Sequence, residues 1–176
     1  MDKRLRKSLR KVRLLILDVD GVLTDGRIIY TSKGHSIKQF NVKDGLGINI
    51  LKKAGIPTIL ISSKASPILK IRAKDMGVEE VYQDVDSKLR IYNRIKRKYN
   101  LKDEEICFVG DDLVDLGVIK RAGVGCAPQD ACEEIKKSAD LVLKSRGGEG
   151  AVRELVELIL KSQNKWSYIV KFYSER

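Results

Sequence analysis

The 176-residue sequence contains no apolar run close to the ~20 residues that a membrane-spanning helix needs. Its basic amino terminus leads into only a short apolar run, at residues 14–17, before acidic residues follow, which is not the pattern of a signal peptide. The three cysteines, Cys107, Cys126 and Cys132, lack Cys-x-x-Cys spacing, and an odd number cannot all pair within one chain. We therefore expect a cytosolic protein without a membrane partner, whose cysteines are small buried hydrophobic residues.

Acidic residues are in the minority, because 35 Lys and Arg against 24 Asp and Glu give a net charge of +11. Seven of the basic residues lie within the first thirteen positions. One interpretation is an arm that binds nucleic acid or an anionic membrane. The other is an amphipathic helix whose Leu5 and Leu9, four residues apart, pack on the body. Aromatic residues, which usually accompany nucleic-acid binding, are absent from this segment, and their absence favours the packed helix.

Apolar runs alternate with helical patterns along almost the whole chain. The pattern predicts strands at 12–17, 58–62, 80–82, 106–109, 123–127 and 141–143. It predicts helices at 45–53, 67–76, 88–99, 113–121, 131–137 and 149–162. Strand–helix alternation with short connections is typical of a parallel sheet covered by helices on both faces. We therefore expect one domain over 1–176, of the three-layer, doubly wound α/β class.

Two segments depart from this alternation. Short strand-like runs at 28–31 and 36–40 flank Ser32, Lys33 and Gly34, which predicts a β-hairpin at 27–40 with glycine in its turn. The tail at 163–176 carries Trp166 and several other large apolar side chains. Such a segment is too apolar to be left in solvent, so we expect it to pack on the body or on a neighbouring subunit.

Acidic residues directly follow two of the predicted strands. Asp18 and Asp20 follow the first strand, and Asp111 and Asp112 follow the fourth. Because ligands bind at the carboxyl ends of the strands in an open parallel sheet, these carboxylates should share one crevice. Such crowding of negative charge is costly unless a cation is present. Hard oxygen ligands without His or Cys nearby select Mg²⁺ over Zn²⁺.

This arrangement suits phosphate-ester chemistry. A carboxylate beside a bound metal can attack a phosphate and form an aspartyl-phosphate. A carboxylate two residues later can protonate the leaving oxygen and then deprotonate the attacking water, and Gly21 would let the chain turn so that both face the site. Ser62, at the end of a predicted strand, and Lys88, at the start of a helix, could hold and neutralise the phosphate. The alternatives for these two are a helix cap and a surface charge.

Taken in order, Asp18 and Asp20, Ser62, Lys88 and Asp111 resemble the four motifs of the haloacid dehalogenase-like phosphatases. The resemblance implies Asp18 as the nucleophile and Asp20 as the general acid/base, with Ser62 and Lys88 completing the catalytic set. It also implies Mg²⁺ held by Asp18, the backbone carbonyl of Asp20, and Asp111. The gaps between these motifs leave no room for a cap domain, so a neighbouring subunit would have to cover the site, with the hairpin as the contact.

Capless members with such a hairpin resemble the 3-deoxy-D-manno-octulosonate 8-phosphate phosphatases, tetramers of lipopolysaccharide sugar synthesis. The resemblance runs from about residue 14 to residue 160 and is most distinctive at 15–23, 40–48 and 147–154. It implies a homotetramer and a small anionic sugar acid phosphate as substrate. The glycines in 147–150 would let a loop approach the mouth of the site, unless they form a plain turn. The implied substrate-binding residues are Asn41, Val42, Lys43, Asp44, Gly45, Lys64, Arg72 and Lys88.

Two departures from the family pattern leave the substrate open. Asn49 stands where the family usually has a basic residue, and Ser62-Ser63-Lys64 stands for Thr-Gly-Arg, which removes the bidentate guanidinium fork. A nonulosonic (sialic-type) acid 9-phosphate is therefore an alternative substrate. A phosphoaspartate signalling receiver also combines carboxylates, a hydroxyl and a lysine, but its accepting aspartate follows the third strand. A nucleic-acid-binding protein driven by the basic amino terminus is the remaining alternative.

Overall fold

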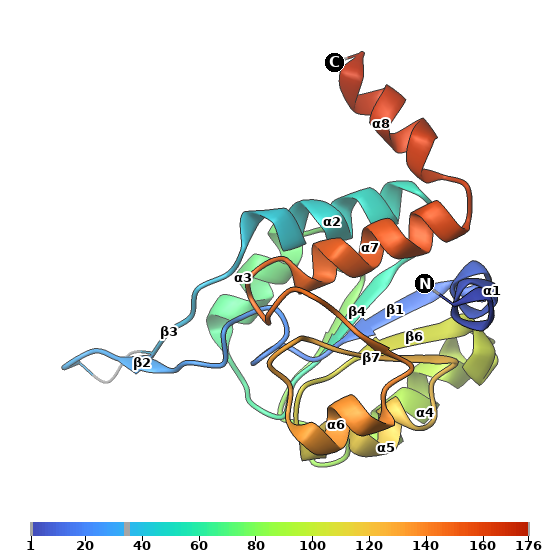
Figure 1. Cartoon of the computed structure of the whole chain (residues 1–176). Coiled ribbons are helices and arrows are strands. Elements are labelled where there is room, and N and C mark those ends of the chain that lie inside the picture. Colours follow the sequence, from blue (N-terminus) through green and yellow to red (C-terminus); the bar gives the residue numbers. More distant parts are fainter. Residues whose placement is uncertain (1, 34–35, 176) are drawn as a thin grey trace.

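The computed structural model of the chain describes residues 2–33 and 36–175 (Figure 1). Its centre is a six-stranded parallel sheet in the order β5-β4-β1-β6-β7-β8. In the middle of the sheet, Leu15 of β1 lies opposite Thr58 of β4 on one side and Cys107 of β6 on the other. The strands are β1 (Leu14–Leu17), β4 (Thr58–Ile61), β5 (Glu80–Tyr82), β6 (Ile106–Val109), β7 (Val124–Ala127) and β8 (Leu141–Val142).

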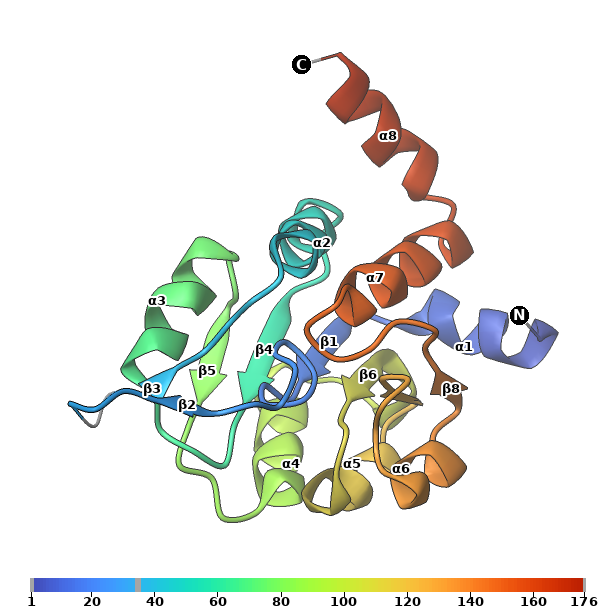
Figure 2. The ribbon, with the colours of Figure 1, turned by 60° about the vertical axis from the view of Figure 1, so that its left-hand side comes forward.

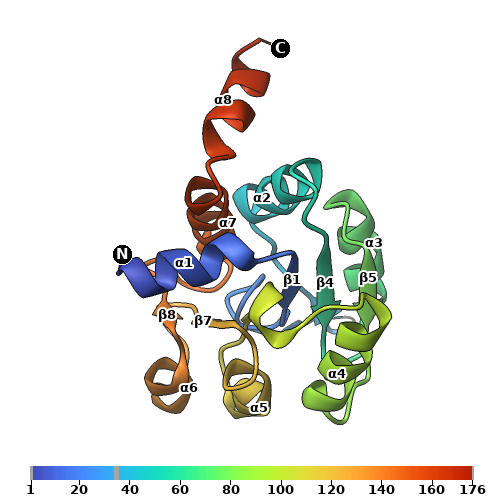
Figure 3. The same cartoon turned by 90° about the vertical axis from the view of Figure 1, so that its right-hand side faces the viewer.

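Helices cover both faces of the sheet, which confirms the predicted three-layer α/β class (Figures 1 and 3). One face carries α1 (Lys3–Lys11), α2 (Val42–Lys53), α3 (Pro67–Asp75) and α7 (Ala151–Ser162). The other carries α4 (Lys88–Lys98), α5 (Leu116–Ile119) and α6 (Glu133–Ser138). Two 3₁₀ turns, Asp103–Glu105 and Leu113–Asp115, complete the connections.

Strand β1 shows how the sequence builds this sandwich. Successive side chains of a strand point to opposite faces of the sheet. Leu15 and Leu17 enter the core beneath α2 and α7, and Leu14 and Ile16 enter the core beneath α4 and α5. All four are fully buried, so the strand is held on both faces and the residue that follows it has a fixed position.

The two termini pack on the same side of the molecule. Leu9 of α1 is buried, Leu5 packs beside it, and Arg10 donates a hydrogen bond to the Ser162 carbonyl of α7 at 3.0 Å. The basic amino-terminal segment is thus a helix docked on the body. In α8 (Trp166–Ser174), Trp166 and Ile169 pack on the same core, whereas the rest of the helix points away from the sheet (Figure 2).

Strands β2 (Ile29–Tyr30) and β3 (Ser36–Ile37) form the predicted antiparallel hairpin. Its strands are shorter than the sequence suggested, and Gly34, placed by prediction in its turn, lies outside the described residues. The hairpin extends away from the body (Figure 1), and its apolar side chains Ile29, Tyr30 and Ile37 are exposed. Isolated two-stranded hairpins of this kind have little stability of their own.

Two of the predicted helices differ from the structure by more than two residues at an end. Helix α2 begins at Val42 rather than at residue 45, because the Asn41 side chain caps it by accepting the backbone N–H of Lys43 at 2.8 Å. The helix expected at 113–121 divides into the 3₁₀ turn and α5. Cys107 and Cys126 are buried side by side with their Sγ atoms 3.7 Å apart, and Cys132 is partly exposed. None of the helices in the described part of the chain is long and apolar enough to cross a membrane.

Candidate active site

The carboxyl ends of β4, β1 and β6 meet at the point where the chain reverses its direction across the sheet. The chain passes from β1 to β4 on one side and returns to β6 on the other, which is where ligands bind in open α/β sheets. A pocket of about 340 Å³ lies there. It is lined by Asp18, Asp20, Gly26, Ile28, Ser62, Ser63, Lys64, Lys88, Asp111, Asp112 and Val114.

An ammonium group between two carboxylates forms the floor of this pocket. Lys88 Nζ lies 2.5 Å from Asp18 Oδ1 and 2.6 Å from Asp115 Oδ1. The side chain of Lys88 is 3% exposed, and that of Asp115 is fully buried. Buried charges persist only when they are paired and hydrogen-bonded. Lys88 is therefore not a surface charge, and its position is tied to strand β1 and to the turn after β6.

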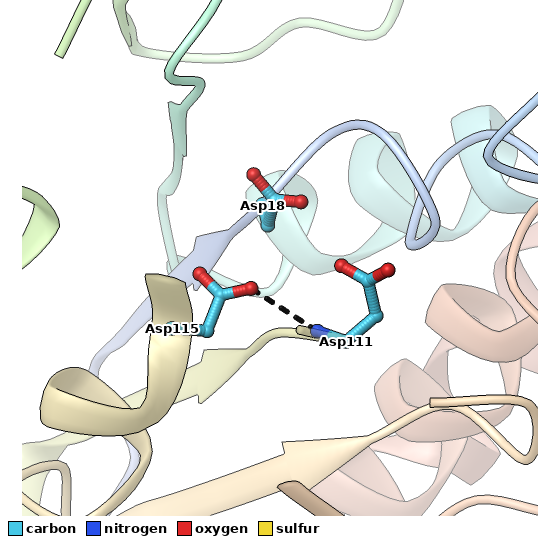
Figure 4. Close-up of side chains that lie close together, drawn as sticks. All are labelled: Asp18, Asp111 and Asp115. Atoms are coloured by element: carbon cyan, nitrogen blue, oxygen red, sulfur yellow. Dashed lines mark hydrogen bonds between the residues drawn. The ribbon is translucent and has the colours of Figure 1, made fainter. Parts of the chain in front are cut away.

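Asp115 returns to the pocket because the chain makes a tight 3₁₀ turn after β6. Its Oδ2 accepts the backbone N–H groups of Asp111 at 3.1 Å and Asp112 at 3.5 Å, and Figure 4 shows the first of these bonds. Gly110 makes this return sterically feasible, since a Cβ there would lie 2.4 Å from the Cβ of Asp115. The turn places Asp18, Asp111 and Asp115 around one space (Figure 4).

A second glycine brings the loop after β1 against Asp111. Gly21 has a φ of +92°, a conformation that side chains with a Cβ rarely adopt. A Cβ at this position would also lie 2.0 Å from Asp111 Oδ2. The buried Thr24 hydroxyl supports the turn by accepting the N–H groups of Gly21 and Gly26, each at 3.3 Å. The predicted sharp turn at Gly21 is confirmed.

The crowded carboxylates resist ionisation. Burial, followed by the charge of nearby Asp115, raises the pKa of Asp18 to about 6 although Lys88 opposes the shift. Burial and the Asp18 charge raise the pKa of Asp111 to about 8. Burial also raises the pKa of Asp115. Burial alone would lower the pKa of Lys88, but the Asp18 and Asp115 carboxylates outweigh it and raise that pKa, so this lysine stays charged.

These residues fit a hard divalent cation. The ligand oxygens of Asp18, Asp111 and Asp115 lie within 4.8 Å of one another. Both Asp115 oxygens already accept hydrogen bonds, one from Lys88 and one from the backbone. Asp18 and Asp111 are therefore the side chains with oxygen atoms to offer a metal. A set of carboxylate oxygens suits Mg²⁺, whose charge would offset the excess of negative charge here.

The residues that follow strand β4 contribute a hydroxyl group and a cationic side chain to the pocket. Ser62 is buried, and its hydroxyl donates to the Lys64 carbonyl at 3.0 Å and accepts the Lys64 N–H at 3.2 Å. This turn directs Ser63 and Lys64 along the pocket wall. Of the two departures from the family pattern, Lys64 thus lines the pocket. Asn49 does not, since its amide donates to the carbonyls of Gly45 and Asp75.

The remaining predicted substrate residues cluster at the start of α2, outside this pocket. Asn41 caps the helix, and Val42 and Lys43 are exposed. Asp44 is buried and accepts the N–H groups of Gly150 at 3.2 Å and Arg153 at 2.9 Å, which caps α7. Gly45 lies against Arg72, whose guanidinium donates to the Asn41 carbonyl at 3.1 Å.

The glycine loop before α7 packs on the loop that follows β1. A Cβ at Gly147 would lie 1.8 Å from the Gly21 carbonyl oxygen, and Gly148 donates its N–H to the Val22 carbonyl. Asn41 donates to the Gly148 carbonyl at 3.2 Å. This loop therefore connects the start of α2 with the edge of the site.

Comparison with known proteins agrees with this geometry. A family profile described as haloacid dehalogenase-like hydrolase matches residues 42–123. The 3-deoxy-D-manno-octulosonate 8-phosphate phosphatase of Haemophilus influenzae is 37% identical over 163 residues, which are 93% of this chain and 91% of that protein. The enzyme of the same description from Yersinia pestis is 38% identical over 88% of this chain and 82% of its own length.

One similar protein has been solved with ligands bound. The Moraxella catarrhalis 3-deoxy-D-manno-octulosonate 8-phosphate phosphatase, in complex with magnesium, phosphate and the sugar acid, superposes with a TM-score of 0.94 at 36% identity, covering 98% of this chain and 99% of that one. A probable phosphatase from Pseudomonas syringae gives a TM-score of 0.97 at 37% identity, with 99% of both chains covered. The chain belongs to the 3-deoxy-D-manno-octulosonate 8-phosphate phosphatase family. It is a capless haloacid dehalogenase-like phosphatase.

Two charged residues of this phosphatase site were given no role by the sequence. The position of Asp115, four residues after Asp111 in the same acidic stretch, is an indication that it belongs to the site. Its contact with Lys88, however, depends on the 3₁₀ turn. For Lys38, just after the hairpin strand β3, the sequence contains no such indication. Its ammonium lies 2.5 Å and 2.7 Å from the two carboxylate oxygens of Asp20.

Proposed function

We propose that this phosphatase hydrolyses 3-deoxy-D-manno-octulosonate 8-phosphate in a magnesium-dependent reaction through an aspartyl-phosphate on Asp18. The observation that carries the mechanism is the buried ammonium of Lys88 between Asp18 and Asp115, with Asp111 and Asp20 on the same pocket. The assignment of the substrate rests on relatives that are named as phosphatases of that sugar phosphate and that this chain matches over 91% and 82% of their length. The full length of the chain acts as one catalytic domain.

In the first step, a carboxylate oxygen of Asp18 attacks phosphorus in line with the ester bond. The bond between phosphorus and the sugar oxygen breaks, and Asp20 gives that oxygen a proton. In the second step, Asp20 takes a proton from water, which attacks the phosphorus and releases inorganic phosphate and free Asp18. Lys88 holds Asp18 in place and offsets the charge of the phosphoryl group. The Ser62 hydroxyl would donate to a phosphate oxygen in place of the Lys64 carbonyl that it contacts here.

Magnesium, held by Asp18, Asp111 and the Asp20 carbonyl, would stabilise the charge on the phosphoryl oxygens. Lys64 lines the pocket beside Ser63 and is placed to meet the anionic end of a substrate. The protein's excess of basic residues would raise the local concentration of such an anion.

Phosphate release from 3-deoxy-D-manno-octulosonate 8-phosphate, with Mg²⁺ or with EDTA, tests the proposal. We expect a strong preference for this substrate over a panel that includes a nonulosonic acid 9-phosphate, and loss of turnover in EDTA. Asp18→Asn should lower kcat by at least about 10³-fold, because it removes the nucleophile. Asp86→Asn, a change at an exposed aspartate, is the matched control. Turnover of the nonulosonic substrate alone would keep the mechanism and replace the substrate.

The hairpin supports a second part of the proposal, association into a homotetramer. Its exposed apolar residues Ile28, Ile29, Tyr30 and Ile37 form a surface that a neighbouring subunit would cover. Asn41, Val42, Lys43 and Arg72 lie outside the pocket that holds Asp18, so an adjacent subunit could present them to a site that is not their own. The mass of the protein in solution, by light scattering, tests this assembly, and a monomer at micromolar concentration would contradict it.

A further inference from the structure

A charged side chain at the end of the hairpin, that of Lys38, is almost fully buried. The Lys38 side chain is 7% exposed, whereas Ile37 immediately before it is an exposed residue. Its ammonium contacts both oxygens of Asp20, at 2.5 Å and 2.7 Å. Removing a lysine ammonium from water is costly, and the cost is offset only by a close, well-oriented partner. The chain therefore returns from the hairpin to the body at this pair.

The pair is separate from the buried charges on the pocket floor. Lys88 is engaged by Asp18 and Asp115, so it does not hold Asp20. Among the described residues, the hydrogen bonds to the Asp20 carboxylate come from Lys38 alone. Asp20 lines the same pocket as Asp18, and its side chain is 28% exposed. Without Lys38, this carboxylate would be free to rotate toward solvent.

Rotation of Asp20 matters for the reaction. A general acid works only within hydrogen-bond reach of the leaving oxygen, about 2.6–3.2 Å between heavy atoms. A misplacement of about 1 Å costs on the order of 10²-fold in rate. Asp20 is the third residue after strand β1 and directly precedes the sharp turn at Gly21, so its backbone is held in place and its carboxylate is the mobile part.

We propose that Lys38 is a positioning residue for the general acid/base: it holds the Asp20 carboxylate at the pocket, where that group meets the leaving oxygen. This inference rests on the proposed role of Asp20 and adds a residue from the hairpin to the catalytic apparatus. Lys38 contacts Asp20 rather than the reacting atoms. Its contribution to the rate should therefore be largest for substrates whose leaving group must be protonated.

Two substrates separate this role from a merely structural one. A sugar alkoxide leaves poorly without a proton, whereas p-nitrophenolate is stable enough to leave without one. We expect Lys38→Met to lower kcat/KM about 10²-fold for 3-deoxy-D-manno-octulosonate 8-phosphate, and less than about fivefold for p-nitrophenyl phosphate. Lys38→Arg should restore part of the loss. Lys33→Met, the same change at an exposed lysine of the hairpin, should leave both values unchanged.

Inhibition by inorganic phosphate and a double variant complete the test. The inhibition constant should change less than about threefold in Lys38→Met, because Lys38 does not touch the phosphate. In an Asp20→Asn background, Lys38→Met should add less than about threefold. Equal losses on both substrates, weakened phosphate binding, or an undiminished loss in that background would overturn the inference. If the wild-type enzyme turned over neither substrate, the proposed function would be contradicted as well. If the wild-type enzyme were active and Lys38→Met had the same kcat/KM on both substrates, only the inference about Lys38 would be contradicted.

Discussion

Two hollows of similar size lie at opposite ends of the sheet, and only one of them is built for chemistry. The carboxyl-end pocket, about 340 Å³, holds Asp18 and Lys88, and the amino-end pocket, about 380 Å³, lies beside the starts of β1 and β4. Polar groups of the amino-end pocket have ordinary partners. Arg10 donates to the Ser162 carbonyl, Gln163 to the Val12 carbonyl, and Arg13 pairs with Glu105.

The difference lies in charge rather than in volume. In the carboxyl-end pocket, Asp18 and Asp115 share Lys88, and Asp111 lies beside them. Burial raises the pKa values of all three carboxyl groups, and repulsion between carboxylates adds to the shift for Asp18 and Asp111. Such perturbed groups in a cleft mark functional sites. In the amino-end pocket, by contrast, the side chains serve the packing of α1 and α7. Substitutions at the two ends should therefore have effects of different kinds.

Among the substitutions that compare the two pockets, Lys88→Met should have the largest effect. The variant would leave Asp18 and Asp115 buried without their cation, which should lower the free energy of unfolding by about 3 kcal/mol at pH 8. The kcat should fall by about 10²–10³-fold, because the positive charge beside the phosphoryl group is lost. Denaturant unfolding and phosphate release measure the two effects.

Lys98→Met is the matched control on the same helix. Lys98 pairs with Glu80 at the surface, where such pairs contribute about 0–1 kcal/mol. A loss of stability in Lys98→Met as large as that in Lys88→Met would show that the buried ion pairs of Lys88 stabilise the fold no more than a surface pair does.

Asp111→Asn should change the pH dependence of stability. Burial and the Asp18 charge raise the folded-state pKa of Asp111 to about 8, against an ordinary value of 3.8. Between these pH values the folded protein keeps a proton that the unfolded chain loses, so in EDTA stability should fall as pH rises toward 8. The variant lacks this loss, so its advantage in melting temperature over the wild type should be larger at pH 8 than at pH 5.5.

Magnesium provides the internal check on that prediction. Adding Mg²⁺ should raise the melting temperature of the wild type at pH 8, because a ligand that binds only the folded state stabilises it. The gain should be much smaller in Asp111→Asn. Equal gains in both proteins would exclude Asp111 as a metal ligand.

The smallest effect is expected from Arg10→Met in the amino-end pocket. The variant loses one hydrogen bond to the Ser162 carbonyl, which should cost about 1 kcal/mol of stability. Because Arg10 lies at the end of the sheet opposite to Asp18, kcat and KM should stay at the wild-type values. A changed kcat would mean that the amino-end pocket is coupled to the chemistry.

The sequence predicted the parts of the site that local patterns determine. The apolar run before Asp18 and the run before Asp111 defined strands, and parallel strands bring their carboxyl ends to one edge. Strand–helix alternation was enough for the three-layer class. The expected helix after β6 was wrong in form, because Asp112 caps a 3₁₀ turn there and directs Asp115 back to Lys88.

Contacts between distant segments could not be predicted in the same way. Lys38 reaches Asp20 across the hairpin, and nothing in the local pattern distinguishes it from the exposed Lys33. The capping of α7 by Asp44 joins residues more than a hundred positions apart. The predicted start of α2 at residue 45 was three residues late, because the helix begins at the Asn41 cap, a side-chain contact that the apolar pattern does not contain.

The two buried cysteines can report when the central sheet opens. Cys107 and Cys126 lie on neighbouring central strands with no exposed surface, whereas Cys132 is partly exposed. A thiol-alkylating reagent should therefore modify one position of the native enzyme quickly and the other two only when the sheet separates. The slow phase would measure the lifetime of the folded sheet without an added label.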